Sequence, residues 1–149
     1  MVNPLEKMQI REMPNARGAC FGMVRNGGKR PHQGWDIYAT VGTAIKAIAT
    51  GKIVNTANSK SGYGKSITLE FTYGPQTLYA FYAHLSKVDV SEGDTVFEGQ
   101  FIGETGITGN AIASAPHLHF EIRESTSAGK GLGKRRDPSE ILGGLFSVC

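Results

Sequence analysis

Glycine recurs between short runs of β-branched and aromatic residues, and this spacing limits the folds that are open to the chain. Twenty of the 149 residues are glycine, and segments such as 66–73 and 76–84 are rich in threonine, leucine, tyrosine and phenylalanine. Such side chains favour strands, whereas glycine permits the tight turns between them. We therefore predict a mainly β protein with many short strands and little helix.

Turn signals between these runs indicate which strands pair. Residues 66–73 are expected to pair with 76–84 across a Gly-Pro turn, and residues 43–49 with 51–56 across a Thr-Gly turn. With 40% hydrophobic residues, the 149-residue chain is long enough for one compact domain with its own core. A second domain is not expected.

The histidines are confined to three short segments. They are Pro31-His32-Gln33-Gly34-Trp35-Asp36, Tyr82-Ala83-His84-Leu85 and Pro116-His117-Leu118-His119-Phe120-Glu121, and they contain all four histidines of the chain. Histidines with separate structural roles would not usually gather in this way, so we predict one site. Its members are His32, Asp36, His84, His117 and His119.

The third of these segments alternates as a strand does. Successive side chains of a strand point to opposite faces, so His117, His119 and Glu121 are expected on one face and the apolar residues between them on the other. Two histidines on an ordinary polar surface would be the simpler interpretation. The apolar opposite face favours instead a polar working face backed by a core.

The first segment supplies a histidine and a carboxylate four residues apart. This spacing fits one face of a helix, but Pro31 and Gly34 favour a loop or a strand edge, and both geometries can bring His32 and Asp36 to one metal. One carboxylate and two imidazoles suit Zn²⁺ and leave a fourth position for water, as in catalytic zinc sites. A catalytic zinc centre is therefore predicted.

Together the three segments resemble the LytM/lysostaphin family of zinc endopeptidases. The similarity continues through Gly51-Lys52-Ile53-Val54, Gly62-Tyr63-Gly64 and the glycine-rich stretch 93–109. The resemblance implies a single-domain antiparallel β-sheet groove of the LytM, or duplicated-hybrid-motif, type. It places an N-terminal extension at 1–30, the peptidase domain at 31–138, and a tail packed on the domain at 139–149.

The resemblance also implies a function, namely zinc-dependent hydrolysis of peptide bonds in the stem peptides or cross-bridges of bacterial peptidoglycan. It assigns His32, Asp36 and His119 as zinc ligands and His117 and His84 as catalytic histidines. A peptidoglycan substrate implies an extracytoplasmic location, although residues 1–7 lack the pattern of a signal peptide. A cognate inhibitor or immunity protein is a further candidate partner.

A mechanism follows from this assignment. Zinc lowers the pKa of its bound water toward about 7 and polarises the scissile carbonyl, so no serine or cysteine nucleophile is needed. His117, one strand period from His119, is expected to take the proton of the water, and His84 to stabilise the oxyanion or protonate the leaving amine. Glu121 is a candidate for orienting a ligand histidine, with an ion pair to Arg123 as the alternative.

Two other function classes are weighed against this one. The hairpin near 93–109 also resembles lipoyl carriers, but no lysine lies between Val88 and Ala115 to carry the group. A phosphohistidine transfer domain could use His84 and His117, but would leave the pair in the first segment without a role. A catalytically silent wall-binding or regulatory module of the same fold would typically have lost ligands, and none is missing here.

The remaining features exclude some partners and leave others open. The basic run 130–136 has no aromatic residue for base stacking, so it is interpreted as a solvated loop and nucleic acid is not expected. No apolar stretch approaches the roughly 20 residues of a membrane span. The net charge of +3 would assist contact with an anionic polymer. Whether Cys20 and Cys149 pair or stay free is left open.

Overall fold

The computed structural model describes residues 1–149, apart from the side chain of Ala113, and its regular structure is mainly strand. The strands are β1 (Gly22–Arg25), β2 (Arg30–His32), β3 (Trp35–Tyr38), β4 (Ala44–Lys46), β5 (Gly51–Asn58), β6 (Lys65–Tyr73), β7 (Gln76–Val88), β8 (Thr95–Val96), β9 (Phe101–Thr105), β10 (His117–Arg123) and β11 (Arg135–Arg136). The helical elements are the 3₁₀ turns η1 (Arg17–Ala19) and η2 (Gly109–Ala113) and the short helix α1 (Ser139–Leu142). The predicted fold class, mainly β with little helix, is confirmed.

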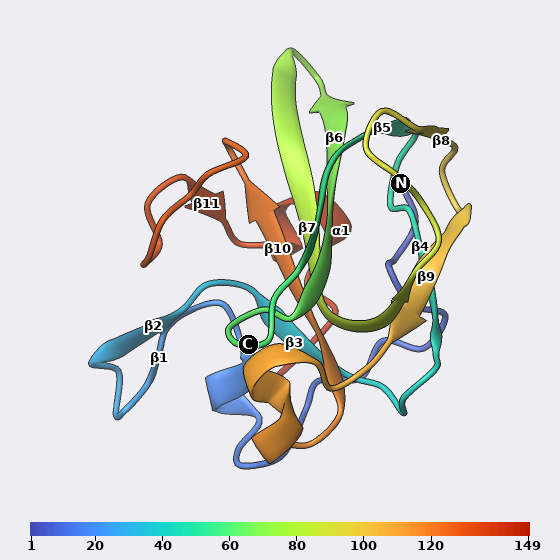
Figure 1. Cartoon of the computed structure of the whole chain (residues 1–149). Helices are drawn as coiled ribbons and strands as arrows, with labels where there is room; N and C mark the ends of the chain where they lie inside the picture. Colours follow the sequence, from blue (N-terminus) through green and yellow to red (C-terminus); the bar gives the residue numbers. More distant parts are fainter.

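One antiparallel sheet of nine strands organises the molecule (Figure 1). Its main path runs β11-β10-β7-β6-β5-β8, and β3 pairs with the edge of β10 that also carries β11, opposite β7. Strand β9 pairs with the far end of β7 and carries β4 at its other edge. The hairpin β1-β2 forms a separate two-stranded sheet that projects from the body (Figure 1).

One predicted strand pair is confirmed and the other is wrong. β6 and β7 pair as expected, with Tyr73 opposite Gln76 at the turn. β4 and β5, by contrast, do not pair with each other, because β4 lies on β9 and β5 lies between β6 and β8. The intervening Ile48 is fully buried and its backbone N–H donates to the Tyr82 hydroxyl. The chain therefore turns into the core at this point instead of folding back on itself.

The expected division of β10 between two environments is confirmed. Leu118, Phe120 and Ile122 are completely buried in the hydrophobic core. His117 and His119, on the opposite face, line a groove. The strand thus joins the core directly to the polar site.

Both ends of the chain are tied to the region around β3. The backbone N–H of Arg11 donates to the carbonyl of Asp36, and that of Tyr38 donates to the carbonyl of Gln9. Cys20, just after η1, forms a disulfide with Cys149, which settles the question that the sequence left open. Within residues 1–149 no helix has the length and apolar character needed to cross a membrane.

Phe120 and Phe101 offer a test of where the core lies, because both are strand phenylalanines but only Phe120 is fully buried, whereas Phe101 is 63% exposed. Phe120→Ala is expected to lower the free energy of unfolding by about 3–5 kcal/mol, because it leaves a cavity in the core. Phe101→Ala should change it by about 0.5 kcal/mol or less. Urea unfolding curves measure both, and equal losses would contradict this core.

Candidate metal centre

The five predicted site residues come together in one groove of about 1120 Å³. His32 ends β2, Asp36 lies on β3, His84 on β7, and His117 and His119 on β10. The sheet register brings them together, because β10 lies between β3 and β7. It places His119 opposite Asp36 of β3 on one side and opposite Ala83 of β7 on the other. The structure therefore unites the three histidine segments.

Asp36 is the centre of this cluster and is almost completely buried. Its Oδ1 accepts a hydrogen bond from His119 Nδ1 at 2.8 Å and lies 3.2 Å from His32 Nε2 and 3.6 Å from His117 Nε2. Burial alone would raise the pKa of Asp36, but the hydrogen bond from His119 and the nearby His32 ring outweigh it and hold the pKa well below its usual range. Asp36 is thus a carboxylate at neutral pH.

Two arginines hold the other oxygen of this carboxylate. Arg25 Nη2 donates to Asp36 Oδ2 at 2.9 Å, and Arg11 Nη2 lies 3.3 Å from the same atom. Arg25 is itself held by a hydrogen bond from its Nε to the carbonyl of Gly18. Because both arginines occupy Oδ2, Oδ1 is left to face the histidines.

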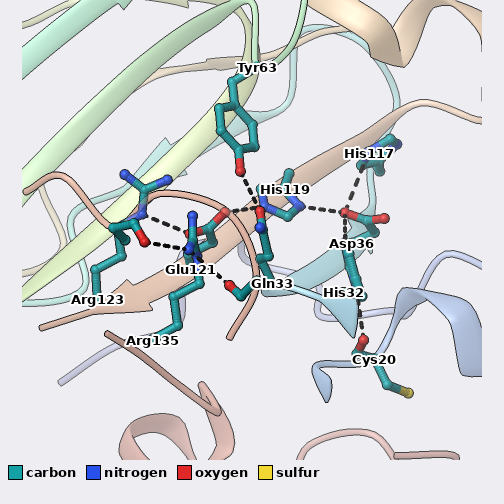
Figure 2. Close-up of polar contacts among 12 residues, drawn as sticks. Cys20, His32, Gln33, Asp36, Tyr63, His117, His119, Glu121, Arg123 and Arg135 are labelled. Atoms are coloured by element: carbon teal, nitrogen blue, oxygen red, sulfur yellow. Dashed lines mark hydrogen bonds and ion pairs between the residues drawn. The ribbon is translucent and has the colours of Figure 1, made fainter. Parts of the chain in front are cut away.

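His32 presents its Nε2 atom to the groove without a hydrogen-bond partner. Its Nδ1 donates to the carbonyl of Cys20 at 2.8 Å, so the proton resides on Nδ1 and Nε2 carries the lone pair (Figure 2). This Nε2 is a buried polar atom with no hydrogen bond among the described residues. Gly34 allows the close approach of this segment to β10, since a Cβ there would overlap the carbonyl oxygen of Phe120.

His119 is held between two carboxylates. Its Nε2 donates to Glu121 Oε2 at 2.7 Å, while its Nδ1 faces Asp36 (Figure 2). Burial opposes a charged ring, but the hydrogen bonds to Asp36 and Glu121 outweigh it and raise the pKa of His119 to about 9 in the absence of metal. The ring is then a cation at the centre of the site.

Glu121 fulfils both roles that the sequence suggested as alternatives. It is fully buried, and besides the bond from His119 its Oε1 accepts from Arg123 Nε at 2.7 Å and from Arg135 Nε at 2.6 Å. Arg135 belongs to the run that was interpreted as a solvated loop, and for this residue the interpretation is wrong. The run re-enters the sheet as β11, where Arg135 pairs with Arg123.

His84 and His117 share a protonation pattern. Nδ1 of His84 donates to the carbonyl of Thr108 at 2.8 Å, and Nδ1 of His117 donates to the carbonyl of Ala115 at 2.7 Å. Burial lowers the pKa of both rings, that of His84 to about 4. Each neutral ring therefore carries its proton on Nδ1 and its lone pair on Nε2.

The backbone at His84 is unusual for a residue within a strand. Its φ is +64°, a left-handed conformation that non-glycine residues rarely adopt. It falls where the pairing of β7 with β6 shifts register, between Tyr82 and Leu85. The local cost is of the order of 1–3 kcal/mol, and such strain is typical of functional positions.

Two tyrosines near the histidines differ in environment. Tyr82 is completely buried in the core. Tyr63 lines the groove, stacks on His119 with ring centroids 5.4 Å apart, and donates from its hydroxyl to Gln33 Oε1 at 2.6 Å (Figure 2). Tyr63 therefore lies in the groove beside His119, where its side chain can contact a bound ligand.

The donor atoms of this cluster fit a metal ion. One ligand atom each from His32, Asp36 and His119 lie within 4.8 Å of one another. Hydrogen bonds on the outer atoms, from His32 Nδ1 to a carbonyl and from His119 Nε2 to Glu121, orient the inner atoms as metal-bound histidines require. Two imidazoles and a carboxylate with a free fourth position match an open site for a metal such as zinc.

A groove with such a donor set is the arrangement of metal-dependent hydrolases. The model of peptidase family M23 matches residues 30–134, which is most of the chain. The chain belongs to peptidase family M23, and the resemblance drawn from the three histidine segments is confirmed.

The relatives of the chain include proteins that are named as endopeptidases. The chain is 45% identical to lysostaphin of Staphylococcus simulans over 96 residues, 64% of this chain and 18% of lysostaphin. It is 44% identical to the glycyl-glycine endopeptidase ALE-1 of Staphylococcus capitis over 96 residues, covering 64% of this chain and 25% of the relative. With the peptidoglycan DD-endopeptidase ShyA of Vibrio cholerae it shares 36% over 92 residues, 62% and 20% of the two chains. It thus spans about a quarter or less of these proteins.

Solved structures show the same fold. The catalytic domain of lysostaphin from Staphylococcus simulans superposes with a TM-score of 0.66 at 37% identity, covering 85% of this chain and 88% of that one. A zinc-containing peptidase from Vibrio cholerae gives a TM-score of 0.66 at 28% identity, covering 80% and 35%.

The lowered pKa of His84 gives a test in the metal-free protein. Its folded-state pKa of about 4 lies below the ordinary value of 6.5. The contribution of the neutral ring to stability is therefore complete above pH 6.5 and is lost as the pH falls toward 4. NMR titration should find the His84 ring neutral, with its proton on Nδ1, down to about pH 4, whereas a midpoint near 6.5 would show that the ring is solvated.

Proposed function

We propose that this chain is a zinc-dependent endopeptidase that hydrolyses peptide bonds in the stem peptides or cross-bridges of bacterial peptidoglycan. The observation that carries the proposal is a complete site in a member of peptidase family M23, with three inward-facing ligand atoms and two further histidines beside them. The names of the relatives ALE-1 and ShyA describe endopeptidases, and that of ShyA names peptidoglycan. These names support the substrate class.

Zinc would be held by His32 Nε2, Asp36 Oδ1 and His119 Nδ1. When bound, it would supply a Lewis acid for the scissile carbonyl and lower the pKa of a water molecule toward about 7. The side chains contribute by fixing these three atoms, through Cys20, the two arginines on Oδ2, and Glu121. Replacement of the proton on His119 Nδ1 by the metal would leave the Nε2–H bond to Glu121 intact.

His117 would act as the general base. Its Nε2 carries a lone pair, because Nδ1 donates to the Ala115 carbonyl, so it can accept a proton from water. The protonated ring keeps its Nδ1 bond and becomes an Nε2–H donor. It can then return the proton to the leaving amine.

His84 faces His117 across the groove, with ring centroids 5.1 Å apart. In its neutral form its Nε2 is an acceptor, so it cannot donate to an oxyanion before it gains a proton. The two rings would therefore share one proton during a catalytic cycle. His84 would stabilise the oxyanion or protonate the amine only after this transfer.

This activity would operate outside the cytoplasm, because peptidoglycan lies there. The Cys20–Cys149 disulfide supports this location, since disulfides persist in oxidising compartments and are rare in the cytosol.

Digestion of purified sacculi tests the proposed activity. The zinc-loaded protein is expected to release muropeptides with new peptide ends, detected by mass spectrometry. A chelator should stop the release, because metal chemistry carries the reaction, and added zinc should restore it. Intact sacculi with stoichiometric zinc bound would instead indicate a silent binding module.

His117 and His119 form a matched pair on one strand. His119→Ala is expected to lose zinc, because it removes a ligand atom, and to lose turnover with it. His117→Ala should keep stoichiometric zinc but lose turnover by about 10²–10⁴-fold, the usual contribution of a general base. Elemental analysis and the sacculus assay measure the two effects. Loss of zinc from His117→Ala would move this residue into the ligand set.

A further inference from the structure

Two loops at one side of the groove carry positive charge without acidic residues among them. Residues 13–35 contain Arg17, Arg25, Lys29 and Arg30 but no aspartate or glutamate. Residues 125–136 contain Lys130, Lys134, Arg135 and Arg136, again with no acidic residue. The first stretch includes the hairpin β1-β2 and the second precedes and includes β11, and both project to the same side of the molecule (Figure 1).

Residues of both stretches line the groove. Four basic residues line it, whereas Asp36 is its one acidic lining residue. The basic residues are Arg11, Arg25, Arg30 and Lys130. Arg11 and Arg25 are engaged with Asp36, so the carboxylate is already matched inside the cluster.

Arg30 and Lys130 remain for a ligand. Both are exposed, and neither appears in an ion pair among the residues that the structure describes. Arg30 also repels Arg25. Burial is the main cause of the lowered pKa of Arg25, the positive charges of Arg11 and Arg30 lower it further, and Asp36 opposes this shift. Like charges gathered without counterions raise the free energy of the empty groove, and an anionic ligand relieves this cost.

We propose that Arg30 and Lys130 select peptide segments that carry free carboxylates next to the scissile bond. This inference rests on the proposed endopeptidase activity and specifies its substrate class. A stem peptide has free carboxylates, whereas a bridge of glycine residues has none within it. The groove therefore favours cleavage within or beside a stem peptide over cleavage inside a neutral glycine bridge.

The attraction would act mainly on substrate capture. Exposed charges steer an oppositely charged ligand, and the effect weakens as salt screens it over a Debye length of about 10 Å at 0.1 M. Other anionic wall polymers carry phosphodiesters instead of carboxylates. A chemical treatment that neutralises carboxylates alone separates these two sources of charge.

The experiment compares two preparations of the same sacculi, one with its carboxylates converted to methylamides by carbodiimide and methylamine, and one treated with methylamine alone. The zinc-loaded wild-type protein is expected to release peptide ends about tenfold faster from the preparation that keeps its free carboxylates than from the methylamidated one. This ratio corresponds to about 1.4 kcal/mol. Phosphodiesters survive the treatment, so capture by phosphate polymers would give equal rates and overturn the inference.

The double variant Arg30→Gln/Lys130→Gln identifies the residues. Both side chains are exposed, so the fold should be unchanged by circular dichroism. The preference of the variant for free carboxylates, measured as the ratio of its own rates on the two preparations, should fall from about tenfold to about twofold, because two positive charges are lost. Lys52→Gln, an exposed lysine on β5 that does not line the groove, is the matched control and should keep the full preference.

The possible outcomes distinguish a failure of the carboxylate preference from a failure of the proposed endopeptidase activity. A double variant that keeps the wild-type preference would overturn the assignment to Arg30 and Lys130. Equal wild-type rates on both preparations would overturn the carboxylate preference while leaving the endopeptidase in place. Cleavage of neither preparation by zinc-loaded protein would overturn the proposed function, and the inference with it.

Discussion

The buried carboxylate of Asp36 is the interaction on which the site depends. An ionised aspartate in the interior is costly unless charged partners surround it, and here two arginines take one oxygen while three histidines face the other. The carboxylate is therefore oriented with Oδ2 toward the arginines and Oδ1 toward the histidines. If Arg11 and Arg25 were absent, Oδ2 would compete with Oδ1 for the histidines, and no single atom would face the position where a metal fits. The two arginines therefore do not merely neutralise Asp36; they decide which oxygen is available.

The part of the site that follows from strand periodicity could be predicted from the sequence. The alternation across His117–Arg123 assigned Leu118 and Phe120 to the core, and the structure confirms this. The confinement of the histidines to three segments suggested one site, and the structure brings these segments together. Each inference used either a local period or a pattern complete within a few residues. The wrongly predicted pairing of β4 with β5 marks the limit, because a local turn signal does not identify a partner that lies 55 to 60 residues away along the chain.

The supporting residues could not be predicted in the same way. Arg11 and Arg25 lie outside any periodic segment, and each reaches Asp36 only because residues 9–11 align along β3 and the hairpin β1-β2 lines the groove. Glu121 was recognised on the correct face, but the sequence could not show that it accepts from a histidine and two arginines at once. Arg135 was misread as solvated, since composition does not reveal that β11 returns to pair with β10. Supporting contacts of this kind depend on tertiary placement.

The two terminal segments are connected to the cluster around Asp36 by hydrogen bonds and a disulfide. The segment around η1 contributes two carbonyl groups, that of Gly18 to Arg25 and that of Cys20 to His32, so it orients one candidate ligand directly and another through an arginine. The disulfide from Cys20 to Cys149 joins this segment to the carboxyl end of the chain, which otherwise packs through Phe146 against Trp35. Because a metal would bind only the arranged ligands, its binding free energy would also stabilise this arrangement. Order in the terminal segments and affinity for a metal would therefore be coupled, although no candidate ligand lies in either terminal segment.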